Sequence, residues 1–298
     1  MRKQLAKLTV TMNSLTTEKR AAIIRALCEG NSVRATGRLT GAAKATVLRL
    51  LVEMGEFASI YQDYAHRNLS CTNVQADELW AFVGAKEANK TKDSQGDIWT
   101  YTALCADTKL LITWLVGPRN GQSNDGFMMD LAGRFAGRIQ LSTDQHNAYV
   151  SSVEKAFGYN GCDFGQVKKT LGSVNEKRGR GSWAKSPEVV RIDRVRVFGE
   201  PVMKDVSTSY VERANLSIRM GNRRFTRLTN GFSKKAENHA HAFSLFAFYY
   251  NYCKPLSTLT KEAKGIQTTP AMAAGLTTYV WTVEDIIDRL DPKRRLSR

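Results

Sequence analysis

Residues 138–144 read Arg-Ile-Gln-Leu-Ser-Thr-Asp, a short extended stretch that ends on an acid, Asp144. Residues 72–76, Thr-Asn-Val-Gln-Ala, lead into Asp77 in the same way. Short runs of this kind are typical of β-strands. Both aspartates are therefore predicted to lie at or near strand ends.

The segments around these two stretches predict a mixed α/β domain. Residues 97–104 and 110–116 read as the two strands of a hairpin, whereas 122–135 and 147–157 are helix candidates on either side of the Asp144 strand. The order strand, hairpin, helix, strand, helix is that of a ribonuclease-H-like mixed sheet. In that arrangement the first strand and the Asp144 strand can be neighbours, which would bring the two aspartates together.

A third acid, Glu212, lies in a helical pattern, because the apolar residues of 206–219 are mostly three or four positions apart. Asn215 and Arg219 share its helical face. Two acids from strands and one from a helix could hold a pair of hard divalent cations through oxygen ligands. The alternative is a surface glutamate that balances the charge of a basic helix.

The charge of the chain points to a polyanionic partner. The formal net charge is +16, which favours nucleic acid or an anionic membrane. The longest apolar stretch, at about 242–250, is too short to span a bilayer, and the basic N-terminus lacks the apolar core of a signal peptide. The sequence therefore predicts a cytoplasmic, nucleoid-associated protein without a membrane partner.

The N-terminal region predicts an all-α DNA-binding module. Thr16 offers an N-cap to a first helix that stops at Gly30, and residues 32–39 and 42–54 carry two further helical patterns. Residues 1–55 contain ten Lys or Arg against three Glu, a net of +7, which favours contacts with phosphates.

The spacing of Gly37, Gly41 and Val47 fits a helix-turn-helix, with a small residue where two helices touch, a glycine turn and an apolar anchor. An alternative is a basic three-helix packing module that touches no DNA. The residues expected to face the major groove of double-stranded DNA are Lys44, Thr46 and Arg49.

Further basic residues follow Glu212. Residues 213–235 contain seven Lys or Arg and no acid, and guanidinium and amide groups there can grip phosphates. Residues 170–205 are interrupted by glycines and prolines and read as a basic insertion, either a DNA-contacting excursion or a solvated loop. The DNA-binding candidates of the Glu212 region are Asn215, Arg219, Arg223 and Arg224.

The cysteines and Glu78 are assigned no chemistry. Five cysteines are odd in number, dispersed and never arranged as Cys-x-x-Cys, which argues against a disulfide framework or a zinc finger. Glu78 adjoins Asp77 but should point to the opposite face of the sheet. It is expected to be structural or to support the site from behind.

Several of these fragments together resemble DDE transposases of the insertion-sequence-one family. They are Asp-Glu-Leu-Trp at 77–80, Thr-Asp at 143–144, Glu-Arg-x-Asn at 212–215 with Arg219, Asn-Arg-Arg-Phe at 222–225, and the aromatic helix 243–252. The similarity spans most of the chain, up to 269–276. It implies that Asp77, Asp144 and Glu212 are the catalytic, metal-binding triad, with Mg²⁺ as the cofactor and Mn²⁺ as a possible substitute. It also implies that Asn215 and Arg219 support either the DNA or the triad.

The resemblance further implies a function on DNA. A transposase of this kind binds element ends, cuts a strand and joins the freed 3′-hydroxyl to target DNA, as a homodimer or larger assembly. Relatives often carry an N-terminal cysteine-rich zinc module whose spacing does not occur here, so end recognition would rest on the helix-turn-helix. Two alternatives stay open: a metal-dependent ribonuclease-H-like nuclease, and a non-catalytic helix-turn-helix regulator.

The predicted organisation has three parts, with a division at about residues 56–70. Residues 1–60 form the helix-turn-helix domain. Residues 70–255 form the ribonuclease-H-like DDE catalytic domain, which includes the basic insertion at about 170–205. Residues 256–298 form a C-terminal tail with an amphipathic helix.

Overall fold

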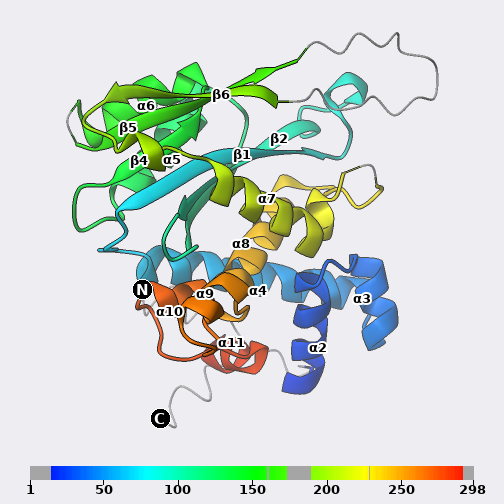
Figure 1. The fold of residues 1–298 in the computed structure, drawn as a ribbon. Helices are drawn as coiled ribbons and strands as arrows, with labels where there is room; N and C mark the ends of the chain where they lie inside the picture. Colours follow the sequence, from blue (N-terminus) through cyan, green and yellow to red (C-terminus); the bar gives the residue numbers. More distant parts are fainter. Residues whose placement is uncertain (1–14, 160, 173–188, 228, 291–298) are drawn as a thin grey trace.

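The computed structural model describes residues 15–159, 161–172, 189–227 and 229–290 (Figure 1). Its helices (α), short 3-10 helices (η) and strands (β) are, in chain order, α2 Thr17–Cys28, α3 Val33–Thr40, α4 Lys44–Ala65, β1 Asn73–Val83, η1 Glu87–Asn89, β2 Gly96–Cys105, β3 Leu111–Gly117, α5 Gly121–Ala132, β4 Gln140–Asp144, α6 Asn147–Phe157, β5 Asp163–Leu171, β6 Val189–Phe198, η2 Met203–Asp205, α7 Ser209–Gly221, η3 Arg223–Phe225, α8 Ala236–Tyr252, α9 Ser257–Glu262, α10 Pro270–Ala273 and α11 Val283–Leu290.

A six-stranded mixed sheet of order β3-β2-β1-β4-β5-β6 lies at the centre. The β1–β4 and β4–β5 pairs are parallel, whereas β1–β2, β2–β3 and β5–β6 are antiparallel. The predicted α/β class is confirmed. The predicted hairpin corresponds to β2 and β3, the two predicted helices to α5 and α6, and the order of elements is compatible with a ribonuclease-H-like fold.

Helices cover both faces of the sheet, because the residues of β1 alternate between two apolar clusters. Val74 and Ala76 belong to the larger cluster, which includes Phe127 of α5 and Tyr149 of α6. Leu79 and Ala81 belong to the second cluster, on the opposite face of the sheet. Their buried partners from α7 and α8 are Val211, Ala214, Ile218, Phe243, Phe246 and Ala247.

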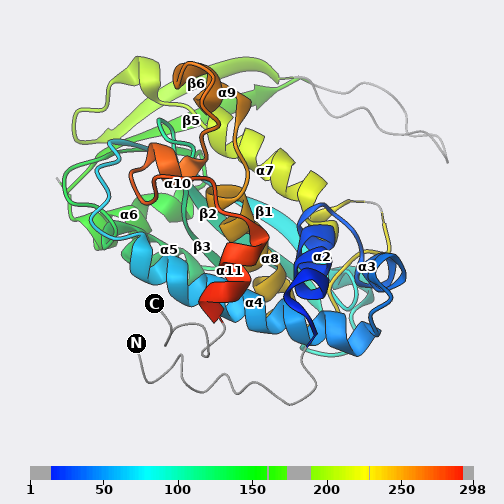
Figure 2. The ribbon, with the colours of Figure 1, turned by 90° about the horizontal axis from the view of Figure 1, so that it is seen from below.

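The N-terminal helices share the core of the sheet domain. The predicted helix at 42–54 continues as α4 to Ala65, so the division expected at 56–70 falls largely inside a helix. A Cβ at Gly55 of α4 would lie 2.5 Å from the His241 carbonyl oxygen of α8. The missing side chain therefore lets the two helices pack closely, and α4 runs beside α8 (Figure 2).

The C-terminal segment is part of the same core. Trp281, Ile286 and Ile287 are buried in the larger cluster, and Arg25 of α2 pairs with Glu284 of α11. The predicted amphipathic helix therefore docks on its own chain. Within the described ranges, no helix is both long and apolar enough to cross a membrane.

Three sequence predictions were wrong in detail. Asp77 lies in the interior of β1, which continues six residues further to Val83, because the second half of the strand buries Leu79, Ala81 and Val83. Residues 189–198 of the predicted insertion form a strand paired with β5; positions 173–188 of that insertion lie outside the described residues. Cys71 and Cys105 form a disulfide, since the β1–β2 pairing brings them together.

A buried polar network joins β3 to the helices below it. The Asn251 side chain of α8 accepts a hydrogen bond from Leu111 N (3.0 Å) and donates to Leu111 O (2.9 Å) and to Gln62 Oε1 of α4 (3.2 Å). His66 is fully buried beside it, with Nδ1 2.9 Å from Ile112 O and Nε2 3.1 Å from the Tyr252 hydroxyl. Burial lowers the pKa of His66 to about 4.

The buried imidazole predicts a loss of stability in acid. The unfolded chain takes up a proton near pH 6.5 that the folded His66 does not accept until about pH 4, so stability is present above the unfolded pKa and is lost as the pH falls. Between about pH 7 and about pH 5 this group should cost roughly 2 kcal/mol of unfolding free energy. His66→Gln should reduce that loss in urea titrations, whereas the partly exposed control His241→Gln should not; equal losses in both variants would contradict it.

Candidate metal centre

The parallel pairing of β1 with β4 sets the geometry of an acidic site. The register pairs Val74 with Leu141 and Gln75 with Ser142. Continued by two residues, the same register places Asp77 beside Asp144, the last residue of β4. The predicted meeting of these two aspartates is present in the structure, and their ligand oxygens lie within 4.8 Å of one another.

Glu78 is the third member of this group. One carboxylate oxygen from each of Asp77, Glu78 and Asp144 lies within 4.8 Å of the other two. The other side of the Glu78 carboxylate faces a cation, since its Oε2 lies 3.6 Å from Arg119 Nη2. Because β4 ends at Asp144, the two adjacent acids of β1, Asp77 and Glu78, can both reach the Asp144 carboxylate. Glu78, which the sequence prediction left outside the ligand set, is therefore a candidate ligand in the structure.

Burial and mutual repulsion raise the pKa of all three acids. Burial, with the charges of Asp144, Glu78 and Glu212, raises the pKa of Asp77 to about 7. The pKa of Glu78 is raised by burial and by Asp144, although the Tyr149 hydroxyl and Arg119 oppose the shift. Burial also raises the pKa of Asp144. The free site is therefore short of positive charge.

The donor atoms fit a hard cation. Glu78 Oε1 and Asp144 Oδ1 are buried without a hydrogen-bond partner in the described part of the chain. A buried carboxylate oxygen left in this state is costly unless it gains a partner. Three carboxylates without sulfur or imidazole ligands suit Mg²⁺ or Mn²⁺.

Glu212, the third predicted ligand, lies beside this group and is held by other partners. Its Oε1 accepts from Thr208 Oγ1 and pairs with Lys169 of β5. The side chain is 42% exposed, yet its charge raises the pKa of both Asp77 and Asp144. Glu212 thus faces the site without forming part of its closest cluster.

Asn215 and Arg219, two of the predicted DNA contacts, make hydrogen bonds within the protein. Asn215 is buried, donates to Asp77 Oδ2 (2.7 Å) and accepts from Thr102 Oγ1 (3.4 Å), so it orients Asp77. Arg219 is partly buried and donates to the Phe225 carbonyl (3.2 Å). Of the two roles open to these residues in the sequence, support of the acids fits Asn215.

The remaining DNA-binding candidates lie on two elements. Lys44 and Arg49 are exposed on the first turns of α4, whereas Thr46 between them is partly exposed. Gly41 ends α3 with a φ of 64°, and Val47 is fully buried. Arg223 and Arg224 belong to η3, which follows α7.

Sequence reasoning missed Glu78, Arg119 and Lys169. For Glu78 the signal was present, because two adjacent acids in a strand of this basic chain are unusual. Arg119 follows β3, and Lys169 lies in β5, a strand with no clear local pattern. Neither cation could be placed at the acids without the sheet order.

Comparison of the sequence with protein-family models and with curated proteins finds no match.

The crowded acids predict a pH-dependent cost that a neutral side chain relieves. The folded pKa of Asp77 is raised to about 7, so its stability contribution is present below the unfolded pKa and is lost as the pH rises. With a chelator present, Asp77→Asn should raise the unfolding free energy by up to about 4 kcal/mol at about pH 8 and change it little at about pH 4. Denaturant titrations of both proteins measure this difference.

Divalent cations should restore the stability that the crowded acids cost at high pH. Mg²⁺ should raise the Tm of the unsubstituted protein at about pH 8, because it binds the folded acids and not the unfolded chain. Asp77→Asn should lose most of this response, and Glu154→Gln, an exposed acid of α6, should keep it. If Asp77→Asn gains as much stability from Mg²⁺ as the unsubstituted protein does, Asp77 is not a ligand of the metal site.

Proposed function

We propose that this chain is a metal-dependent DNA transposase that binds the ends of a mobile element, cuts DNA strands and joins them to target DNA. The observation that carries the proposal is the cluster of Asp77, Glu78 and Asp144, with unpartnered buried oxygens, inside a chain of net charge +16. The resemblance of the fragments at 77–80, 143–144 and 212–215 to DDE transposases supports the choice of reaction.

The residues around the cluster would each have a part in that chemistry. A divalent cation held there would supply a Lewis acid for the phosphodiester and lower the pKa of a bound water or hydroxyl. Asp77, Glu78 and Asp144 would provide the oxygen ligands, and Asn215 would keep Asp77 oriented. Lys169, which now pairs with Glu212, could pair with a DNA phosphate instead, since a lysine can bind either anion. Glu212 would then be free to become a further oxygen ligand.

Basic elements on the flanks fit a DNA substrate. Lys168 and Lys169 are exposed on β5, and Arg213 is exposed on α7 next to Glu212. Lys169, which pairs with Glu212 and lies near enough to Asp144 for its charge to act on that acid, would help to hold a DNA backbone against the acids. The first turns of α4, with Lys44, Thr46 and Arg49, would read the element end in the major groove.

The acids should be needed for catalysis and not for DNA binding. Asp77→Asn, Asp144→Asn and Glu212→Gln should each reduce Mg²⁺-dependent cleavage and joining more than about 100-fold, because each removes a charged oxygen ligand. Glu78→Gln tests the added member of the cluster in the same assay. The measurement uses pure protein, a supercoiled target plasmid and DNA that carries the sequences flanking the coding region.

Glu154→Gln is the matched control and should keep activity. Normal joining by any of the substituted proteins would exclude that acid from the centre. Cleavage that is independent of the flanking sequence and leaves no joined product would favour a nuclease of the same fold over a transposase. Activity without a divalent cation would exclude the metal centre altogether.

The first turns of α4 should carry sequence preference. Lys44→Ala and Arg49→Ala should each cost roughly 1–3 kcal/mol of preference for the element end over a scrambled duplex, if the side chains reach base edges. Arg223→Ala should weaken both duplexes alike and lower the salt slope by about one. Competition binding at several salt concentrations separates the two patterns, and unchanged preference in the Lys44 and Arg49 double variant would exclude this helix as the reader.

A further inference from the structure

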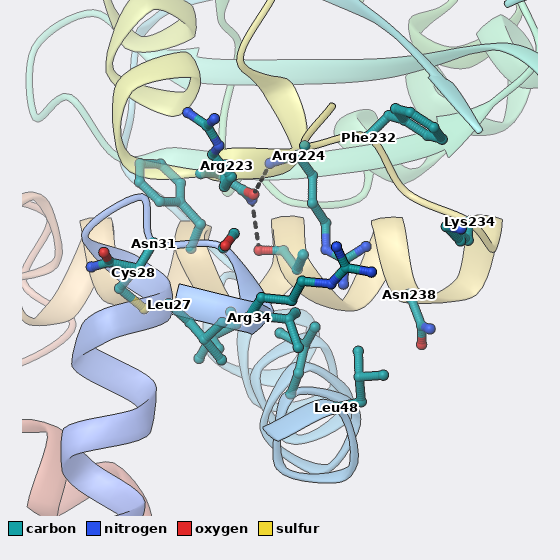
Figure 3. A pocket seen from close by; sticks show the side chains of 18 of the residues that line it. Leu27, Cys28, Asn31, Arg34, Leu48, Arg223, Arg224, Phe232, Lys234 and Asn238 are labelled. Carbon is teal, nitrogen blue, oxygen red and sulfur yellow. Dashed lines mark hydrogen bonds between the residues drawn. The ribbon is translucent and has the colours of Figure 1, made fainter. Parts of the chain in front are cut away.

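A deep basic cavity lies away from the acids, where the N-terminal helices meet the segment that follows α7. Its volume is about 640 Å³. Its walls come from the α2–α3 connection, the first turns of α3 and α4, η3 with the loop behind it, and α8 (Figure 3). A cavity of this size lies within the range that is typical of sites for small organic ligands.

The charges in this cavity have one sign. The described residues that line it include Arg34, Lys44, Arg223, Arg224 and Lys234, and none of them is Asp or Glu. Arg34 of α3 and Arg224 of η3 project toward one another from opposite walls, whereas Arg223 points away (Figure 3). Two guanidinium groups that project into a cavity without a carboxylate offer an anion a binding place between them.

Arg224 is held in place by a chain of hydrogen bonds. Asn222 is buried, donates to Ala242 O (2.9 Å) and accepts from Arg224 N (3.2 Å). Arg224 Nη1 donates to Ser233 Oγ (3.0 Å), which lies 2.9 Å from His239 Nδ1. Burial lowers the pKa of Arg224 to about 10. The cation is thus oriented before any ligand arrives, although no described acid neutralises it.

The rest of the cavity is apolar with amide groups at its edge. Leu27, Val33 and Leu48 are partly exposed and line it together with the buried Phe246. The side-chain amides of the lining residues Asn31, Asn230 and Asn238 make no hydrogen bond within the described part of the chain. A flat heterocycle could lie on the aliphatic wall while an amide pairs with its edge.

We propose that this cavity binds a single unpaired nucleotide of a DNA strand, with its phosphate between Arg34 and Arg224 and its base against Leu27 and Leu48. This proposal rests on the proposed action on DNA and adds a site that is separate from the acids. A contact with the backbone of a DNA duplex would need only cations on an open surface. This cavity also has an apolar recess, which such a contact would not use.

The position of the cavity relative to the acids fits one DNA molecule. α7 carries Glu212 in its first turn, and η3 follows its end at Gly221. The nine residues between them span roughly 14 Å at about 1.5 Å per residue. At 3.4 Å per nucleotide of one strand, that is about four nucleotides. A nucleotide in the cavity would therefore lie a few positions from the phosphodiester at the metal centre.

The test compares two short fluorescein-labelled duplexes of the same sequence, one fully paired and one with a single bulged adenosine. Binding to the full chain is followed by anisotropy in the presence of a chelator, so catalysis cannot contribute. The protein should bind the bulged duplex roughly tenfold more tightly, since a captured base and a bidentate phosphate are gained together. Arg224→Met and Arg34→Ala should abolish this preference.

Matched controls remove one positive charge outside the cavity. Arg227→Met, three residues after Arg224, and Arg38→Ala, one turn after Arg34, should weaken both duplexes slightly and keep the preference. Without DNA, the Arg224→Met protein should also have a higher Tm than the Arg227→Met protein, because Arg224→Met removes an uncompensated, partly buried cation.

Equal affinity for the two duplexes, or a preference that survives both Arg224→Met and Arg34→Ala, would overturn the nucleotide site. Either result would leave the proposed DNA function intact, provided that the paired duplex binds. Failure to bind either duplex would overturn both proposals. Loss of strand joining in the acid variants has no effect on this assay, which isolates the cavity from the metal centre.

Discussion

The parallel register between β1 and β4 is the constraint on which the rest of the structure depends. It aligns Gln75 with Ser142, and two residues later Asp77 and Asp144 meet. A shift by one residue would turn one aspartate to the other face of the sheet. The same register makes Gln75 available to α7, since its Oε1 accepts from Tyr210 N (2.9 Å) and Val211 N (3.1 Å). The strand pair thus places both the acids and the start of the helix that carries Glu212.

The helices under the sheet relate this centre to the DNA-binding candidates. Gly30, in the turn between α2 and α3, has a φ of 78°, and a Cβ there would lie 2.6 Å from Met220 O. The α2–α3 connection therefore contacts the end of α7 through backbone atoms, without a side chain between them. Because Gly55 likewise fixes α4 on α8, the exposed first turns of α4 occupy a defined position relative to α7. An N-terminal module packed in this way acts as part of one body with the sheet.

Local patterns predicted what local forces determine. The caps at Thr16 and Ser32 accept from Lys19 N and Ala35 N, and the first helices begin where the sequence indicates. The pairing of Asp77 with Asp144 followed from the order of elements. The full length of β1, the strands β5 and β6, and the Cys71–Cys105 disulfide were missed, because each depends on pairing between distant segments. Strand alternation placed Glu78 on the opposite face of the sheet from Asp77 and so left it out of the predicted ligand set. Alternation does not account for the end of β4 at Asp144, where one carboxylate can be reached by both residues.

Two places in the molecule hold like charges close together, and they have opposite signs. Asp77, Glu78 and Asp144 form one, and the cations that line the cavity, Arg34 and Arg224 among them, form the other. Folding alone gives no reason for either, since replacing such groups by neutral ones of similar shape is often stabilising. Both become favourable when an ion of the opposite sign binds, and a nucleic acid with its divalent cations supplies the two signs together. α7 and η3 connect the sites, so one strand could satisfy both. The stability that the free protein forgoes would then be recovered on binding.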